Sequence, residues 1–243
     1  MAKNKTESSS GLIQWPELIR GTLIRRYKRF LADVRLKTGE TVTAHCPNSG
    51  SMQACCQPGR PVYLSQHDNP KRKLKYTWEL IDMPASLVGV NTQLPNHLVS
   101  QAIADGQVRE LSGYADIRRE VKVGEHSRLD IRLHDREKGT CYVEVKNCTL
   151  VENGIARFPD AVTARGQKHL AELGRLVKAG NRAAMFFLIQ RMDANLFHPA
   201  DDIDPVYGRE LRKAHAAGVE IVAYDVRITL EEISLNRSVK FKI

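Results

Sequence analysis

The 243-residue chain contains no apolar run near the roughly 20 residues that a membrane-spanning helix needs. Its opening, MAKNKTESSSG, lacks the apolar centre of a secretory signal. Its five cysteines are an odd number, and the adjacent pair Cys55-Cys56 near His45-Cys46 is not the C-x₂-C spacing of a zinc knuckle. We therefore expect a soluble cytoplasmic protein with reduced thiols, no membrane partner and no zinc, and we exclude a secreted disulfide scaffold.

Acidic residues are scarce in the first third of the chain. Residues 1–75 contain 14 Lys and Arg but only 5 Asp and Glu, whereas the remainder contains 23 of each, so this third carries the whole net charge of +9. The cations gather in residues 20–37 and 71–75. A strongly basic N-terminal third followed by a neutral remainder favours a polyanionic partner, with nucleic acid as the first candidate. The alternative is a set of solvated strand edges that Lys and Arg protect from pairing.

The first 90 residues predict a small β-barrel of the OB-fold type. Residues 1–17 begin with a polar, Ser-rich stretch and are expected to form a flexible tail. Short segments rich in β-branched and aromatic residues follow, separated by Asn, Pro and Gly, and no convincing helix lies among them. The strand candidates are residues 22–36, 41–44, 61–65, 76–82 and 87–90. Such a barrel binds single strands by stacking bases above a basic groove.

Several residues of this domain are candidates for nucleic acid contact. Cations alternate with aromatics in RRYKRF at 25–30, and KRK at 71–73 is followed by two aromatics at 76 and 78. The polar CPNSGS loop at 46–51 offers hydroxyl and backbone donors to a phosphate. The candidates are Arg25, Arg26, Lys28, Arg29, Asn48, Ser49, Lys71, Arg72 and Lys73. As alternatives, Phe30 and Trp78 fill the barrel core and residues 46–51 form a plain connecting loop.

Residues 91–243 predict a second domain of mixed α/β class. Apolar spacing predicts a helix over 96–105 and another over 160–178, with Asp160 as its N-cap. A third helix is expected between Asp204-Pro205 and Gly218. Strands are predicted at 119–123, 128–133, 141–150, 183–189 and 219–226, of which the continuous apolar run 183–189 is typical of a buried strand.

The strands at 128–133 and 141–150 bring together residues that carry chemistry. Alternation predicts Leu129, Ile131 and Leu133 on one face of the sheet and Asp130 on the other, while Glu144 and Lys146 share a face on the next strand. A turn centred on Glu137 places position 130 opposite 144, with their Cβ atoms about 5 Å apart.

Two directly opposed carboxylates favour a cation between them. Mg²⁺ or Mn²⁺ held by Asp130 and Glu144, with Glu120 as a possible third acid, would activate water beside Lys146 for phosphodiester hydrolysis. Arg165 and Lys168 share one side of the following helix with His169 and are expected to meet a phosphate. The alternative is a solvent-facing salt-bridge ladder, which strand pairs often carry.

Six motifs in one order resemble the sugar fermentation stimulation protein A family of bacteria and archaea. They are HCPNSGSM (45–52), NPKRKLKYTWEL (69–80), ELSGY (110–114), SRLDIRL (127–133), CYVEVKNCTL (141–150) and FPDAVTARGQKHL (158–170). The resemblance extends from about residue 18 to the C-terminus and implies an OB-fold-like domain over 1–90 and a PD-(D/E)XK nuclease-like domain over 91–243. It also implies a DNA partner, a role in regulating sugar metabolism, and Asp130, Glu144 and Lys146 as the nuclease triplet. Leu129 stands where related nucleases usually have proline.

Three functions remain open at this point. The first is a Mg²⁺-dependent DNA phosphodiesterase acting on single- or double-stranded DNA. The second is a non-catalytic DNA-binding regulator that retains the nuclease fold. The third is an adaptor whose basic surface meets RNA or an acidic protein.

Overall fold

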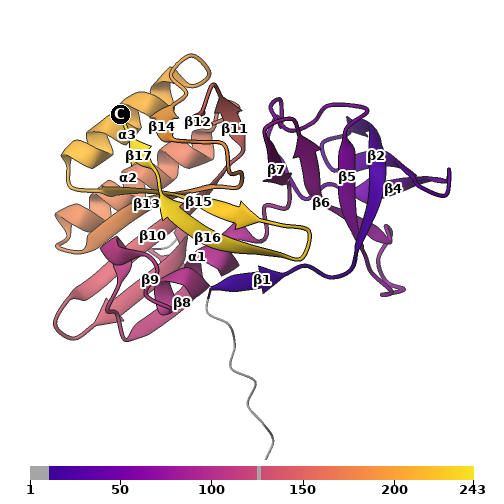
Figure 1. Ribbon diagram of the computed structural model, residues 1–243. Coiled ribbons are helices and arrows are strands. Elements are labelled where there is room, and N and C mark those ends of the chain that lie inside the picture. The colour runs from indigo at the N-terminus through magenta and orange to yellow at the C-terminus, as the bar shows by residue number, and fades with distance from the viewer. Residues whose placement is uncertain (1–10, 125–126) are drawn as a thin grey trace, which may run out of the picture.

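The computed structural model describes residues 11–124 and 127–243, which form two domains side by side (Figure 1). The predicted fold class is confirmed, because a small OB-like barrel precedes a mixed-sheet domain. None of the described helices is long and apolar enough to cross a bilayer.

The barrel consists of antiparallel strands that one parallel contact closes. Its strands are β2 (Leu18–Tyr27), β3 (Leu31–Leu36), β4 (Thr41–His45), β5 (Pro61–Gln66), β6 (Tyr76–Met83) and β7 (Ser86–Gly89). They follow the order β4-β3-β2-β5-β6-β7, and β4 also pairs with β6. Trp78 is fully buried in the barrel core, as one alternative expected, whereas Phe30 is 45% exposed and does not fill it.

The second domain is built on a seven-stranded mixed sheet. From edge to edge its strands are β1 (Leu12–Gln14), β16 (Glu232–Ser238), β15 (Glu220–Ile228), β13 (Arg182–Ile189), β10 (Gly139–Cys148), β9 (Ser127–Asp135) and β8 (Asp116–Val123). A smaller sheet contains β11 (Leu150–Glu152), β12 (Ile155–Phe158), β14 (Leu196–Pro199) and β17 (Lys240–Phe241). The helices are α1 (Pro95–Ala104), α2 (Ala164–Lys178) and α3 (Pro205–Ala216), with a 3₁₀ turn over Arg109–Leu111.

The continuous apolar run of β13 explains how the sheet acquires two hydrophobic faces. Ala184, Phe186 and Leu188 pack in one core cluster with residues of α1, whereas Met185 and Phe187 pack in a second cluster with residues of α2 and α3. A strand covered on both faces cannot alternate with polar residues, and this accounts for its uninterrupted apolar sequence.

The N-terminal tail differs from its prediction. Residues 1–10 lie outside the described residues, but β1 pairs with β16 in the sheet of the second domain. Trp15 follows β1, donates its backbone N–H to Glu231 and packs in the core with α1. The prediction of a flexible tail over 1–17 is therefore incorrect for the segment from β1 to Trp15. This segment packs with the second domain and not with the barrel.

The start of α2 also differs from its prediction. The N-cap is Thr163, whose hydroxyl accepts a hydrogen bond from the backbone N–H of Gly166, and the helix begins at Ala164. Asp160 lies before the helix and contacts the barrel instead. The predicted start of α3 is confirmed, since Asp204 accepts from the N–H of Tyr207 and Pro205 is the first helical residue.

Candidate metal and nucleic acid site

The hairpin of β9 and β10 has the predicted register. Ile131 lies opposite Val143 and Asp135 lies opposite Gly139, and continuing this register brings position 130 level with 144. The ladder ends at Ile131, however, so Asp130 and Glu144 do not form a backbone pair. Asp130 instead accepts the backbone N–H of Val145 at 2.8 Å, which fixes its carboxylate at the point where the two strands separate.

One predicted side-chain face is incorrect. Ile131 and Leu133 pack with the α1 cluster as expected, but Leu129 packs with the cluster of α2 on the other face. The break coincides with Glu120 on the adjacent strand, whose φ of +53° interrupts regular extension opposite Asp130. Simple alternation through this point of β9 therefore fails.

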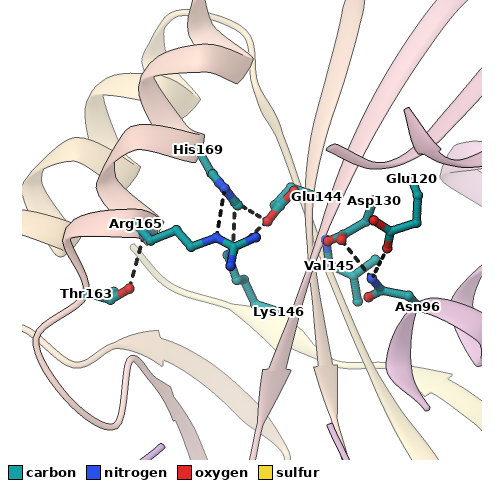
Figure 2. Close-up of polar contacts among 10 residues, drawn as sticks. Asn96, Glu120, Asp130, Glu144, Val145, Lys146, Thr163, Arg165 and His169 are labelled. Carbon is teal, nitrogen blue, oxygen red and sulfur yellow. Dashed lines mark hydrogen bonds and ion pairs between the residues drawn. The ribbon is translucent and has the colours of Figure 1, made fainter. Parts of the chain in front are cut away.

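Glu144 is the most deeply placed charged group of the hairpin. Its side chain is buried, and Oε1 accepts a hydrogen bond from Lys146 Nζ at 2.7 Å and also contacts His169 Nδ1 (Figure 2). Burial would raise the pKa of Glu144, but the hydrogen bond from His169 and the charge of Lys146 outweigh it and hold the pKa below its usual value. The other carboxylate oxygen, Oε2, is buried and has no hydrogen-bond partner among the described residues.

Asp130 lies on the opposite side of Glu144 from Lys146 and His169 (Figure 2). Its Oδ1 accepts from the Asn96 side chain at 2.7 Å, so α1 helps to orient the carboxylate. Burial, followed by the nearby charge of Glu144, raises the pKa of Asp130 to about 6. The two acids therefore repel each other within one partly covered site, which is the condition that a bound cation relieves.

Glu120 does not join these acids in a three-carboxylate cluster. Its side chain is half exposed, with its oxygens 3.5 Å from Asn96 Nδ2 and 3.8 Å from Arg128. Across residues 11–124 and 127–243, no group of three or more His, Cys, Asp and Glu side chains could hold a metal ion. A cation site here would rest on Asp130 and Glu144, with water or phosphate completing its shell, as Mg²⁺ sites commonly do.

Asp130 and Glu144 lie in a cleft of about 420 Å³ between the two domains. Asp130, Glu144, Lys146, Arg165 and His169 form one side of the cleft. The barrel supplies the other side through Asn48, Ser49 and Gly50, which we call the barrel loop together with Ser51. The predicted triplet thus meets the predicted phosphate-binding loop, although the two are about 100 residues apart in sequence.

Arg26 holds the barrel loop in place. Its guanidinium donates to the backbone carbonyls of Asn48, Gly50 and Ser51 at 2.8, 3.0 and 3.2 Å. Asn48 is likewise occupied within the protein, since its side chain is buried, donates to Val90 and accepts from Gly50. Two of the predicted nucleic acid contacts are therefore bracing residues, whereas Ser49 is exposed in the cleft wall.

Of the other cations predicted to contact nucleic acid, Arg165 alone lines the cleft. Arg165 is exposed in its wall, with Nε 3.5 Å from His169, whereas Lys168 is exposed but outside the lining. The remaining ones belong to the barrel and do not line the cleft; they are Arg25, Lys28, Arg29, Lys71, Arg72 and Lys73. Arg25 pairs with Asp33 at 2.8 Å, and Arg72 donates to Thr77 at 2.9 Å.

Asp160 and Asn96 are site residues that the sequence analysis missed in these roles. The Asp160 carboxylate accepts the Met52 backbone N–H at 3.1 Å and the Ser51 hydroxyl at 3.2 Å, which fastens the barrel loop to the second domain. Asn96 joins α1 to Asp130. No spacing rule connects partners 108 and 34 residues apart, so only the assembled fold identifies them.

A substitution at Gly50 tests the contact between Asp160 and the barrel loop. A Cβ atom on Gly50 would lie 2.6 Å from the Asp160 carboxylate, so Gly50→Ala is expected to displace the loop and lower the free energy of unfolding by about 1–3 kcal/mol. Gly174→Ala is the matched control, because Gly174 lies within α2 with no atom near its Cβ position. That variant is expected to stabilise the protein by about 0.5–1 kcal/mol. Denaturant unfolding of both variants checks the prediction, which fails if their stabilities change in the same direction.

Two family models match successive parts of the chain. "SfsA N-terminal OB domain" matches residues 24–90, and "Sugar fermentation stimulation protein RE domain" matches residues 93–232. The fold is similar to the solved structure of Pyrococcus furiosus SfsA in complex with Ca²⁺, with a TM-score of 0.87 and 29% sequence identity. The match covers 95% of this chain and 98% of that chain.

Curated relatives are closer in sequence. The chain is 60% identical to a sugar fermentation stimulation protein homolog of Geobacter sulfurreducens over 218 residues, which cover 90% of this chain and 93% of the relative. It is 50% identical to the homolog of Maricaulis maris over 228 residues, which cover 93% and 97%. With both domains matched and their order preserved, the chain belongs to the sugar fermentation stimulation protein family.

Proposed function

We propose that the protein is a DNA-binding phosphodiesterase whose nuclease-like site holds a divalent metal ion between Asp130 and Glu144. The observation that carries this proposal is the cleft itself, in which two mutually repelling acids, an ammonium group and the barrel loop meet. The Ca²⁺ complex of the Pyrococcus furiosus relative adds support for a divalent ion. The net charge of +9, which lies entirely in the first third of the chain, supports a polyanionic substrate.

The donor set fits Mg²⁺ or Mn²⁺. Glu144 Oε2 is buried and has no hydrogen-bond partner among the described residues, and burial together with the nearby charge of Glu144 raises the pKa of Asp130 to about 6. Hard divalent ions take carboxylate oxygens and retain several waters, so two acids suffice. When bound, the ion would lower the pKa of a water molecule and stabilise negative charge on a phosphate oxygen.

The protein's own groups have separate tasks in this proposal. Lys146, held by Glu144 at 2.7 Å, orients the attacking water and offsets its developing charge. His169 stabilises the position of both groups, since its Nδ1 lies 3.1 Å from Lys146 Nζ and contacts Glu144. Arg165, at the exposed end of this cluster, binds a neighbouring phosphate. A place in the regulation of sugar metabolism is the cellular role that we propose for this activity.

The test combines metal, DNA and pH. Labelled single- and double-stranded oligonucleotides are incubated with the protein and Mg²⁺, Mn²⁺ or a chelator, and products are resolved on gels. We expect metal-dependent cleavage, and DNA retention that weakens steeply with salt. Metal binding, followed as a rise in melting temperature, should weaken as the pH falls below about 6, because protons then compete for Asp130.

The outcomes separate the alternatives. Salt-dependent binding without cleavage under either metal would favour the non-catalytic DNA-binding regulator. An absence of DNA retention at low salt would leave the adaptor for RNA or an acidic protein, which RNA and polyglutamate competition would then distinguish.

A further inference from the structure

The turn between β2 and β3 presents an aromatic ring to solvent. We call residues 28–30 the hairpin tip. Lys28 and Arg29 adopt φ values of +47° and +63°, a left-handed conformation that is costly for residues other than glycine. Phe30 ends this turn, is 45% exposed and is not among the residues of the barrel core. The turn thus presents a large apolar ring to solvent next to two exposed cations.

The hairpin tip is fastened to the wall of the cleft. The Arg26 guanidinium that holds the barrel loop also donates from Nε to the carbonyl of Arg29 at 2.8 Å. The backbone N–H of Cys46, just before the barrel loop, donates to the carbonyl of Phe30 at 2.8 Å. One side chain and one backbone hydrogen bond therefore join the hairpin tip to the segment that carries the barrel loop.

Further cations lie near the hairpin tip. Arg25 lies 4.9 Å from the centre of the Tyr27 ring on the strand leading to the tip and is itself exposed. Arg72 lies near enough to His45 to help lower the pKa of that imidazole, after the larger effect of burial, and His45 lies opposite Leu31, which directly follows the hairpin tip. Cations of two separate loops thus gather at one end of the barrel.

We infer that Phe30 is a stacking platform for an unpaired base, and that the preferred substrate is therefore single-stranded DNA or a single-stranded end whose phosphates continue from the hairpin tip into the cleft. This inference rests on the proposed function. An exposed ring next to cations matches the two requirements of single-strand binding, a face for a base and positive charge for the backbone. Within a duplex both faces of each base are already stacked on neighbours, so the ring has no partner there.

The experiment compares Phe30→Ala with Phe241→Ala. Phe241 is the matched control, because it is 39% exposed but lies on β17 in the second domain. Binding of a fluorescent single-stranded oligonucleotide and of its duplex is measured by anisotropy at constant salt, with Ca²⁺ present. Phe30→Ala should weaken single-strand binding about 5- to 150-fold and duplex binding less than about 2-fold. Phe241→Ala should change neither.

A third variant supplies an independent signal. Phe30→Trp should retain single-strand affinity, and its tryptophan fluorescence should be quenched by the single-stranded oligonucleotide, against a constant background from the buried Trp15 and Trp78. Unchanged single-strand binding by Phe30→Ala, or equal losses for single strand and duplex, would overturn the inference while leaving DNA binding intact. If the wild type binds neither form, the proposed function fails first and the inference fails with it.

Discussion

Replacement of Glu144 by glutamine is expected to reduce metal-dependent DNA cleavage by at least about 100-fold. Glutamine has the shape of glutamate and retains an acceptor oxygen for Lys146, so the change removes a negative charge and a proposed metal ligand from a buried position while preserving the packing. Losing one fixed electrostatic contact to a reacting centre typically costs about 10²–10³-fold in rate. Initial rates with Mg²⁺ and with Mn²⁺ on the preferred oligonucleotide measure the effect.

A control variant on α2 shows whether the effect is specific to Glu144 or follows from removing any carboxylate near the site. Glu172 pairs with Arg175 on the same helix as His169 but lies outside the cleft, so Glu172→Gln should cleave DNA at the wild-type rate. The metal-induced rise in melting temperature should also be lost in Glu144→Gln and retained in Glu172→Gln. A Glu144→Gln protein that keeps more than about a tenth of the wild-type rate would remove Glu144 from the proposed mechanism.

Replacement of Asp204 by alanine is expected to lower the free energy of unfolding by about 2–4 kcal/mol. Asp204 is buried and joins the first turns of two helices, because it caps α3 through Tyr207 N–H and also accepts the Thr163 N–H before α2, both at 2.9 Å. Alanine removes the cap and leaves a buried donor without a partner. Cleavage should fall as well, since this contact positions the turn of α2 that carries Arg165.

The neighbouring acid Asp202 is the control for this prediction. It is exposed and pairs with Arg157 at the surface, so Asp202→Ala should cost less than about 1 kcal/mol. Denaturant unfolding of both variants provides the comparison. If the two variants are equally stable, Asp204 does not have the proposed structural role.

The pH dependence of the Asp204 effect has a defined sign. Burial would raise the pKa of Asp204, but the backbone N–H groups of Thr163 and Tyr207 outweigh burial and hold the pKa below the ordinary 3.8. A carboxyl whose pKa is lower in the folded state stabilises the protein above its unfolded pKa and loses that contribution as pH falls through the folded value. The stability difference between wild type and Asp204→Ala should therefore be constant near neutral pH and shrink below 3.8.

Local patterns were sufficient for much of the fold. Alternation in β9 and β10 predicted the register that places Asp130 level with Glu144, since pairing in a hairpin depends only on the turn and the pleat. The apolar run of β13 and the Asp204-Pro205 start of α3 were equally readable. β16 was not predicted, although Ile233 and Leu235 alternate with polar residues as is typical of a half-buried strand.

The assembled site was less predictable. Arg26 and Asn48 have the composition of nucleic acid contacts, but tertiary hydrogen bonds occupy their polar groups, and no local pattern distinguishes a bracing arginine from a ligand-binding one. Likewise, the role of Asp160 depends on a barrel loop 108 residues earlier in the chain. Side chains that connect two domains carry no periodic signal, because their partners are set by docking rather than by the strand or helix that bears them.

The pairing of β1 with β16 makes the second domain discontinuous in sequence, with the whole barrel inserted between its first and second strands. A fragment beginning at residue 91 would lack an edge strand and the buried Trp15, whose indole N–H donates to Thr229. In the complete sheet β1 therefore pairs with a strand more than 200 residues later in the sequence, and the barrel lies in the segment between them. Attempts to separate the domains by truncation should retain residues 11–17, joined through a short linker to residue 91.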